Sequence, residues 1–203
     1  FRSLSVAPDG GGVAAAGADG LLRIVRAADG EATALVSVHD EINHVAFSPD
    51  GRRVATAGQD GRVAITAADG RPISDWDTGD EPLFGLAWGP EGTTLASGGG
   101  DRSIRIHDVA AGGRVIVEAR PFDVPAAGVP ADAEVEAIAF LGADRLVASC
   151  GRTAALLDAA SLDVIRFLSG HEGTVGDIDV SADGRRIVTS GSDRQPQIGR
   201  AHV

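Results

Sequence analysis

The sequence predicts an all-β fold built from repeated four-stranded units. Two turn signals, one containing proline and one containing aspartate, each recur at intervals of 41 residues: Pro8, Pro49 and Pro90, then Asp19, Asp60 and Asp101. Between the turns, apolar residues alternate with polar ones, which is the period of half-buried strands. A fixed period of roughly 40 residues with four short strands per unit is typical of a propeller blade. We therefore expect a β-propeller of four-stranded antiparallel blades.

Residues 45–66 show why each element is predicted. A short strand (45–47) runs into the turn Ser48-Pro49-Asp50-Gly51, where proline fixes φ and glycine accepts a positive φ. A second strand (54–57) ends at another glycine-rich turn, and a third strand follows at 63–66. Helices are not expected, because glycine interrupts the chain every few residues and apolar residues lack helical spacing.

The same pattern places five blades along the chain, near residues 4–36, 45–75, 86–118, 138–168 and 178–197. The first blade is expected to contain strands at 4–6, 13–16, 21–25 and 33–36. The second ends with a fourth strand at 73–75, and the third contains 86–88, 95–97, 104–107 and 115–118. The fourth blade is more divergent, with strands at 138–140, 146–149, 154–157 and 164–168. The fifth contains 178–180 and 187–190, and its pattern stops after Asp193.

An insertion separates the third and fourth blades. Equivalent aromatic residues are 41 residues apart from Phe47 to Trp88, but 52 apart from Trp88 to Phe140. The extra residues lie in 120–133, where three prolines exclude a central strand. Insertions in repeat proteins often map to the binding face, although surface insertions are also tolerated without a function. Phe122 in this segment is accordingly a candidate partner-binding residue.

The last residues, 198–203, are expected to lie outside the propeller. The sequence Gln195-Pro196-Gln197 interrupts the place where a third strand of the fifth blade would run. The letters IGRAHV resemble the translation of a sequencing-library adapter, so we interpret this tail as non-native. A genomic sequence that continues through Val203 would contradict that interpretation. The chain also contains no methionine, and we expect it to be a fragment of a propeller with about seven blades, within the range known for this architecture.

Composition and charge narrow the class of partner. The chain has 29 acidic residues against 18 basic ones, which gives a net charge of −11. This balance disfavours nucleic acid and anionic membranes as partners, and no apolar run is long enough to span a membrane. All basic residues are arginines, a bias that suits a GC-rich bacterial genome. We expect a cytoplasmic protein with a protein or peptide as its partner.

No residue set points to catalysis or to a metal. The single Cys150 excludes an internal disulfide and a multi-cysteine metal site. His39 and His44 flank two acids, but they precede a strand within a loop, which favours a structural role. Aspartates are spread one per turn, unlike a calcium loop, and Gly98–Asp101 lacks the other features of a phosphate loop. We expect no catalytic residue, no metal and no cofactor.

The fifth unit carries a family resemblance. Gly170-His171 precedes an apolar strand, the turn at 181–184 follows, and Gly191-Ser192-Asp193 closes the pattern. This order resembles a WD40 repeat, in which a Gly-His pair precedes the first strand and an aspartate lies between strands two and three. The resemblance covers about residues 4–193. It implies a propeller that acts as a non-enzymatic platform for protein assembly.

The resemblance also implies structural roles for particular residues. His171 with Thr189 and Asp193 could mimic a catalytic triad, but in this family such groups form a buried hydrogen-bond network. No blade carries the complete tryptophan, serine or threonine, histidine and aspartate set of the family. The expected structural residues are one histidine and four turn aspartates: His171, Asp19, Asp60, Asp101 and Asp193.

The expected partner-binding surface is the ring of loops that lead into the first strand of each blade. These loops surround one end of a propeller's channel. Besides Phe122, the candidate residues are Asn43, His44, Phe84, Glu136 and Asp177. An aromatic side chain beside acids suits a peptide that carries basic and apolar groups. Whether Phe84 is exposed or buried between blades stays open.

We expect a protein–protein interaction scaffold without catalytic activity of its own. By family analogy it would be the regulatory or sensing part of a larger bacterial protein, such as one with a kinase or NTPase module. One alternative is the propeller portion of a hydrolase or peptidase, which a catalytic triad in flanking sequence would favour. Another is a TolB-like periplasmic accessory propeller, which shares this type of turn and which an upstream signal peptide would favour.

Overall fold

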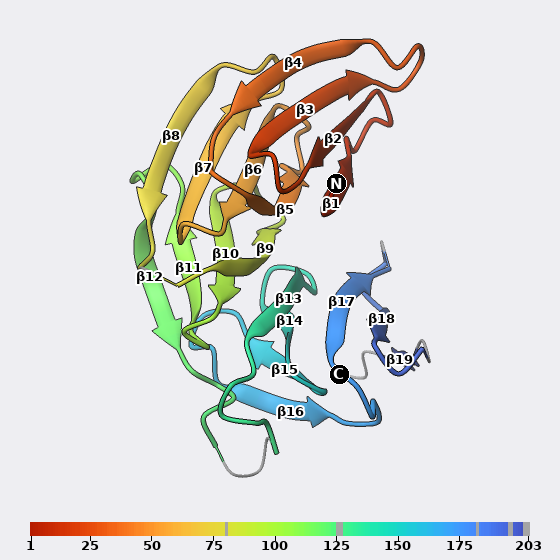
Figure 1. Cartoon of the computed structure of the whole chain (residues 1–203). Helices are drawn as coiled ribbons and strands as arrows, with labels where there is room; N and C mark the ends of the chain where they lie inside the picture. The colour runs from red at the N-terminus through yellow and green to blue at the C-terminus, as the bar shows by residue number, and fades with distance from the viewer. Residues whose placement is uncertain (80, 125–127, 182, 195–196, 201–203) are drawn as a thin grey trace.

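The strands form an open ring of five blades (Figure 1). The computed structural model describes residues 1–79, 81–124, 128–181, 183–194 and 197–200, and every regular element among them is a β-strand. Four sheets contain four strands and the fifth contains three, always with strands that are consecutive in sequence lying side by side. All pairings are antiparallel. The predicted all-β propeller with four-stranded blades is therefore confirmed.

Each blade is a simple up-and-down sheet. Blade one contains β1 (Ser3–Val6), β2 (Gly12–Ala16), β3 (Leu21–Arg26) and β4 (Ala32–Ser37). Blade two contains β5 (Ile42–Phe47), β6 (Arg53–Gly58), β7 (Arg62–Ala67) and β8 (Pro72–Asp77). Blade three contains β9 (Leu83–Trp88), β10 (Thr94–Gly99), β11 (Ile104–Asp108) and β12 (Arg114–Ala119). Blade four contains β13 (Val135–Phe140), β14 (Arg145–Cys150), β15 (Thr153–Asp158) and β16 (Val164–Leu168). Blade five contains β17 (Val175–Val180), β18 (Arg186–Gly191) and β19 (Gln197–Arg200).

The first strand of each blade lies on the inside of the ring, and in the four-stranded blades the fourth strand lies on the outside (Figure 1). The inner strands β1, β5, β9, β13 and β17 contact one another in that order. Because strand direction alternates within each blade, the starts of all inner strands lie at the same end as the turns between second and third strands. We call this the upper end. The turns between first and second strands, and between third and fourth strands, lie at the opposite, lower end.

A β-bulge interrupts four of the five inner strands at the same repeat position. In β5 the pairing shifts between Ile42 and His44, which leaves Asn43 as the extra residue. Equivalent shifts in β9, β13 and β17 leave Phe84, Glu136 and Gly176 as extra residues. A bulge breaks the alternation of side chains. The sequence pattern therefore placed the start of each of these strands three residues late, after the bulge.

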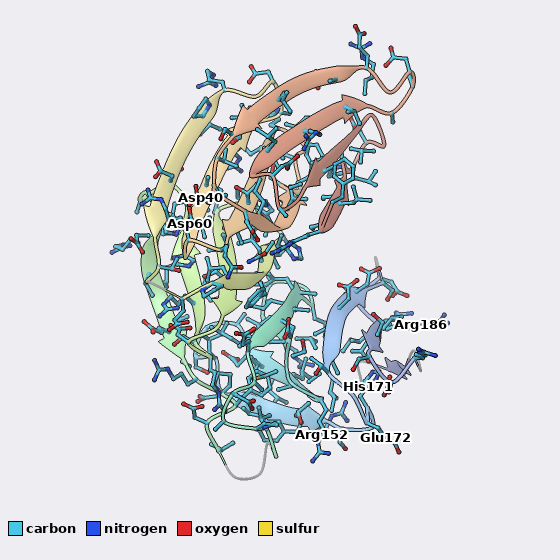
Figure 2. All side chains as sticks on the ribbon, viewed as in Figure 1. Asp40, Asp60, Arg152, His171, Glu172 and Arg186 are labelled. Carbon is cyan, nitrogen blue, oxygen red and sulfur yellow. The ribbon has the colours of Figure 1, made fainter. Side chains whose placement is uncertain are left out.

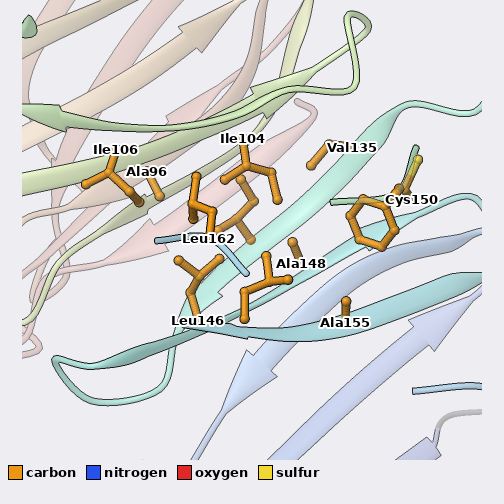
Figure 3. Packing of buried hydrophobic residues seen from close by; sticks show 12 residues of the cluster. Ala96, Ile104, Ile106, Val135, Leu146, Ala148, Cys150, Ala155 and Leu162 are labelled. Atoms are coloured by element: carbon orange, nitrogen blue, oxygen red, sulfur yellow. The ribbon is translucent and has the colours of Figure 1, made fainter. Parts of the chain in front are cut away.

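The core lies between blades rather than within one central layer. Each neighbouring pair of blades encloses its own cluster of buried apolar side chains. Figure 3 shows the cluster between blades three and four, where Ile104 and Ile106 of β11 face Leu146 and Ala148 of β14. Stacking against a neighbour is how a blade buries its faces, because one sheet alone cannot enclose a core.

The strand β19 corrects the prediction for the end of the chain. Residues 197–200 pair with β18 from Arg186↔Arg200 to Thr189↔Gln197 and so form the third strand of blade five. Backbone pairing along the free edge of β18 does not depend on which side chains the added strand carries. The break at Gln195-Pro196-Gln197 therefore did not exclude a strand from Gln197 onward. Of the predicted tail, residues 201–203 lie outside the described residues.

Candidate functional site at the upper end of the channel

One repeat position, which carries a different residue in each blade, contributes to the lining of a cavity of about 550 Å³ at the upper end of the channel. The four bulge residues and the equivalent position in blade one all line this cavity: Arg2, Asn43, Phe84, Glu136 and Gly176. Bulges redirect side chains and are frequent next to functional sites. The strands thus hold a ring of chemically different side chains on a repeated backbone.

The predicted candidates Asn43, His44, Phe84, Glu136 and Asp177 all line this same cavity. They lie within the inner strands, at the ends where these begin, and not in the preceding loops as the sequence suggested. Phe84 and Glu136 are partly exposed and Asp177 is exposed, so their side chains are accessible. Arg2 and Asp179 also line the cavity, and sequence reasoning missed both. The alignment of repeats could have found Arg2, because it stands 41 residues before Asn43.

Asn43 links neighbouring blades through hydrogen bonds. Its amide nitrogen donates to the carbonyl oxygen of Leu83 in blade three at 3.0 Å and to Gln59 at 3.1 Å. Its side-chain oxygen accepts from Arg2 of blade one, whose guanidinium also pairs with Glu41 at 2.7 Å. Because these contacts use the polar atoms of Asn43 and also engage Arg2, the two residues hold neighbouring inner strands together.

His44 and Glu136 are titratable groups held partly out of water. Burial lowers the pKa of His44, while nearby Asp177 and a hydrogen bond to the backbone of Phe84 act in the opposite direction. Burial raises the pKa of Glu136, and the neighbouring charge of Glu134 raises it further. A carboxylate that is desolvated next to another carboxylate is relieved by a cation. The cavity therefore favours a positively charged group.

A second cavity of about 520 Å³ adjoins the first, since Glu136 lines both. Figure 2 shows Arg152 and Glu172 close together at the loops of blades four and five, and both line this second cavity. The insertion contributes Pro130, Asp132 and Ala133 to its wall. The lining includes four acidic residues and one arginine: Asp132, Glu134, Glu136, Glu172 and Arg152. The negative character of the channel mouth thus extends outward over blades four and five.

Arg102 fixes the insertion to blade three. Its guanidinium donates to the carbonyl oxygens of Phe122 and Ala131, both at 3.3 Å, and pairs with Asp123 at 3.0 Å. Arg102 has φ +65, the conformation that Gly61 adopts at the equivalent turn of blade two. At Gly61 a Cβ atom would overlap the carbonyl oxygen of Gly79 in the following loop. At the equivalent turn of blade three, where the longer insertion follows, the arginine side chain is accommodated and contacts that insertion.

Phe122 is not a partner-binding residue, which corrects the prediction. Its side chain is 1 % exposed and belongs to the apolar cluster between blades three and four. The prediction rested on the place of Phe122 in the insertion, because insertions in repeat proteins often map to the binding face. Instead, the anchoring of this segment by Arg102 lets the ring fill the core, where its burial is favourable.

Two blades contain the same buried histidine network. In blade five, His171 Nε2 lies 2.8 Å from Thr189 Oγ1, and its Nδ1 lies 2.8 Å from Asp193. In blade two, His39 contacts Thr56 and Asp60, each at 3.0 Å. The sequence pattern indicated the first set and only placed His39 near the corresponding position.

Both networks connect loops to strands. Each histidine precedes an inner strand, each threonine lies in a second strand, and each aspartate lies in the following turn. The imidazole side chains are 1 % and 5 % exposed, so neither is open to a substrate. Satisfied buried polar groups of this kind hold a fold in one arrangement. This geometry supports the predicted structural role.

Blade three replaces this network with different contacts. His107 on β11 is fully buried, and its Nε2 lies 2.7 Å from Ser97 Oγ while its Nδ1 lies 3.0 Å from the carbonyl oxygen of Gly113. Nδ1 therefore carries the proton, and Ser97 donates to Nε2. The turn residue Asp101 pairs with Arg105 at 2.5 Å. Burial opposes ionisation of Asp101, but Arg105 and the Ser103 N–H hold its pKa below the usual value.

The histidine environments predict a pH-dependent stability. Burial lowers the pKa of His107 below its usual 6.5, and burial also lowers that of His44. The unfolded chain then binds more protons than the folded chain once the pH falls below about 6.5, so unfolding free energy decreases as pH falls toward about 5. Urea unfolding at about pH 7.5 and about pH 5.5 measures this decrease.

A His107→Phe variant provides the control for that measurement. It removes the titrating ring, so the decrease in unfolding free energy between the two pH values should become smaller, even though Ser97 loses its acceptor. An unchanged decrease in this variant would show that His107 does not titrate as its surroundings indicate.

Among the described residues, no group of three or more histidine, cysteine, aspartate or glutamate side chains is arranged to hold a metal ion. In the same part of the chain, no helix is long and apolar enough to cross a membrane. Cys150 is buried, and burial raises its pKa to about 11, so its thiol is protonated near neutral pH.

Comparison with known proteins identifies the family. The model of the WD domain, G-beta repeat, matches residues 30–65, 70–108 and 162–197, which together make up more than half of the chain. Each matched stretch begins at the outer strand of one blade and continues into the next blade. The chain belongs to the WD40 family, one of the two propeller families that its turns left open. The WD40 propeller fold supports a role as a protein-interaction scaffold and is typically without catalytic activity.

A solved structure shows the same fold at low sequence identity. A chain in a crystal structure of the mitotic checkpoint complex superimposes with a TM-score of 0.84 at 19% identity, over 98% of the present chain. The present chain spans 63% of the length of that chain. No curated protein matches the sequence.

Proposed function

We propose that this WD40 chain is an interaction scaffold that binds a segment of a partner protein in the cavity at the upper end of its channel. The observation that carries the proposal is the ring of bulge positions. Four blades share the bulge, and the residues at this position and at its equivalent in blade one are arginine, asparagine, phenylalanine, glutamate and glycine. Because the residue at this repeat position differs from blade to blade, the cavity suits recognition of an asymmetric ligand.

The chemistry of the lining supports a partner segment with basic and apolar groups. Glu136, Asp177 and Asp179 place carboxylates on one side of the cavity, and Phe84 adds an accessible aromatic ring. A lysine or arginine side chain can pair with these acids, and its aliphatic part or a neighbouring apolar residue can contact the ring. The net charge of −11 adds long-range attraction for a positive partner and repulsion for nucleic acid.

The role is non-catalytic in this proposal, and the histidine geometry supports that. The two sets that combine histidine, threonine and aspartate have their imidazoles buried inside blades, away from the channel mouth. By family analogy the chain would serve as the regulatory or sensing part of a larger protein. That part of the proposal rests on the family and on no residue of the cavity.

A peptide selection tests the proposal. The purified chain is immobilised and exposed to a library of random peptides, and the selected sequences are then measured by fluorescence anisotropy. We expect selected peptides to combine arginine or lysine with an aromatic or aliphatic residue. The double variant Glu136→Gln with Asp177→Asn should bind them about tenfold or more weakly. A close charge pair contributes about 1.4 kcal/mol or more to the binding free energy, and about 1.4 kcal/mol corresponds to a tenfold change in Kd.

A matched control separates the cavity from overall charge. Asp163 is exposed in the turn between β15 and β16, at the lower end. The Asp163→Asn variant should bind the selected peptides as the unaltered chain does. Selection of acidic peptides, or an equal loss of binding in the control, would contradict the proposed site.

A further inference from the structure

One repeat position at the lower end of the propeller usually carries an arginine. It is the residue that closes the turn between the first and second strands, where its carbonyl oxygen accepts the N–H of the residue after the first strand. Ser48 N–H donates to Arg53 in this way, and Ala7 N–H donates to Gly12, both at 2.8 Å. The residues at this position, from blade one to blade five, are Gly12, Arg53, Thr94, Arg145 and Arg186. Blade one therefore lacks a side chain that three of the other blades have.

Arg53 shows what an arginine contacts at this position. Its guanidinium carbon lies 4.8 Å from the centre of the Trp88 ring in blade three, which is a cation–π distance. One guanidinium nitrogen donates to the carbonyl oxygen of Gly92 at 2.8 Å and lies 3.8 Å from the carboxylate of Asp50. An aromatic ring, a turn carbonyl and a carboxylate thus form a guanidinium site between blades two and three.

The same three groups occur between blades one and two, without the arginine. The ring, the turn glycine and the carboxylate each have a counterpart 41 residues earlier: Phe47, Gly51 and Asp9. All three counterparts line a cavity of about 260 Å³ at the lower end, together with Gly12. The Phe47 Cζ atom lies 3.7 Å from the place that a Cβ atom of residue 12 would occupy. This cavity, which we call the lower pocket, lies where the side chain of Arg53 lies in the next interface.

The charges around the lower pocket favour a cation. Asp9 contributes a carboxylate, one oxygen of which accepts from Gly11 N–H at 2.8 Å. Arg26 also lines the pocket, but its guanidinium pairs with Asp29 at 2.7 Å and with Glu31 at 3.2 Å. The three carboxylates therefore outnumber the one guanidinium. Asp9, Gly11 and Arg26 are exposed, so the pocket opens at the surface of the protein.

From the contacts of Arg53 we infer that the lower pocket binds an arginine side chain of a partner protein. The guanidinium lies against Phe47, donates to the turn carbonyl of Gly51 and pairs with Asp9. Arg53 enters its own site as a side chain on a polypeptide, and an arginine of a partner reproduces that approach. This inference is independent of the partner site at the channel mouth, because the lower pocket lies at the opposite end of the propeller.

A titration with a capped amino acid tests the inference. N-acetyl-arginine amide presents the side chain without the charges of the free amino acid, and the amide shifts of the ¹⁵N-labelled chain are followed residue by residue. We expect saturable shifts at Gly11, Gly12 and Gly51, with a Kd in the millimolar range. The lysine counterpart should bind about threefold more weakly, because its ammonium lacks the planar face that stacks on a ring. The citrulline counterpart, which is uncharged, should give no saturable shift at these residues.

A Gly12→Arg variant supplies the arginine from the chain itself. Gly12 lies in β2, and the nearest atom to its Cβ position, the carbonyl oxygen of Val25, is 3.6 Å away, so a side chain fits. This variant should lose the lower-pocket shifts and unfold at an equal or higher urea concentration. The control variant Ala110→Arg adds the same charge to an exposed lower-end turn of blade three and should keep the shifts.

An Asp9→Asn variant keeps the test valid if Gly12→Arg does not fold. The asparagine retains an acceptor for Gly11 N–H but loses the charge, so the affinity for N-acetyl-arginine amide should fall about threefold, as expected for a partly exposed ion pair. An unchanged affinity in this variant would overturn the inference by itself.

Four further results would overturn it. The lower-pocket shifts could be absent in the unaltered chain, or they could persist in Gly12→Arg. The citrulline probe could bind as tightly as the arginine probe, which would mean that the pocket accepts an uncharged group. Free arginine could bind about tenfold or more tightly than the capped probe, which would make a small molecule the occupant.

Discussion

The Gly113→Ala variant is expected to lose about 3 kcal/mol or more of unfolding free energy, a loss typical of overpacking combined with backbone strain. Gly113 lies between β11 and β12 with φ +84, a conformation that side chains other than glycine rarely adopt. A Cβ atom at this position would overlap the indole ring of Trp76. Trp76 is buried between blades two and three, and its ring lies 5.5 Å from that of His107.

Gly112 provides a matched control one residue earlier. It also has a positive φ, +66, but no atom lies within 4 Å of the place where its Cβ would be. Gly112→Ala should therefore cost only the backbone strain, about 1 kcal/mol. Urea unfolding followed by tryptophan fluorescence measures both variants. Equal losses in the two would show that contact with Trp76 does not constrain this turn.

The Leu86→Ala variant is expected to lose about 3 kcal/mol of unfolding free energy, within the range for fully buried leucines. Leu86 is 2% exposed and packs in the cluster between blades two and three. Removing its side chain leaves a cavity at the point where β9 meets the preceding blade. The loss should appear as a lower midpoint in urea without a change in the steepness of the transition.

Leu4→Ala makes the same chemical change at the same repeat position of blade one. Because Leu4 is 66% exposed, the loss there should be within about 0.5 kcal/mol. A large loss at Leu4 would mean that its side chain is covered in solution by something the five blades do not supply. A small loss at Leu86 would contradict the packing of blade on blade.

The sequence allowed the number and order of the blades to be predicted because repeats reinforce one another. A single turn such as Ser48-Pro49-Asp50-Gly51 is weak information, but its return at a fixed interval constrains every strand between. Backbone pairing was harder to predict, as β19 shows, because an edge strand can form with little help from its side chains. The bulges could not be predicted from the sequence either, because a bulge interrupts the alternation of apolar and polar residues that indicates a strand.

The channel-mouth residues were found through their place before each inner strand, and the structure brings all five of those to one cavity. The prediction for Phe122 was wrong because its ring packs in the cluster between blades three and four. The backbone of Phe122 is also bound by Arg102, which lies 20 positions earlier, and such contacts cannot be read from the local sequence. The role of His107 was likewise hidden. A histidine near the end of β11 becomes part of a hydrogen-bond network only when the fold brings the Ser97 hydroxyl of the neighbouring strand β10 within reach of its ring.

The proposed partner site at the channel mouth is tested most directly by measuring hydrogen exchange with and without a selected basic peptide. If the channel mouth is the binding site, protection should increase in the backbone amides at the starts of β5, β9, β13 and β17. The outer strands β4, β8, β12 and β16 should exchange as before, because they lie away from the channel (Figure 1). Protection confined to the outer strands or to the lower-end turns would contradict the assignment of the partner site.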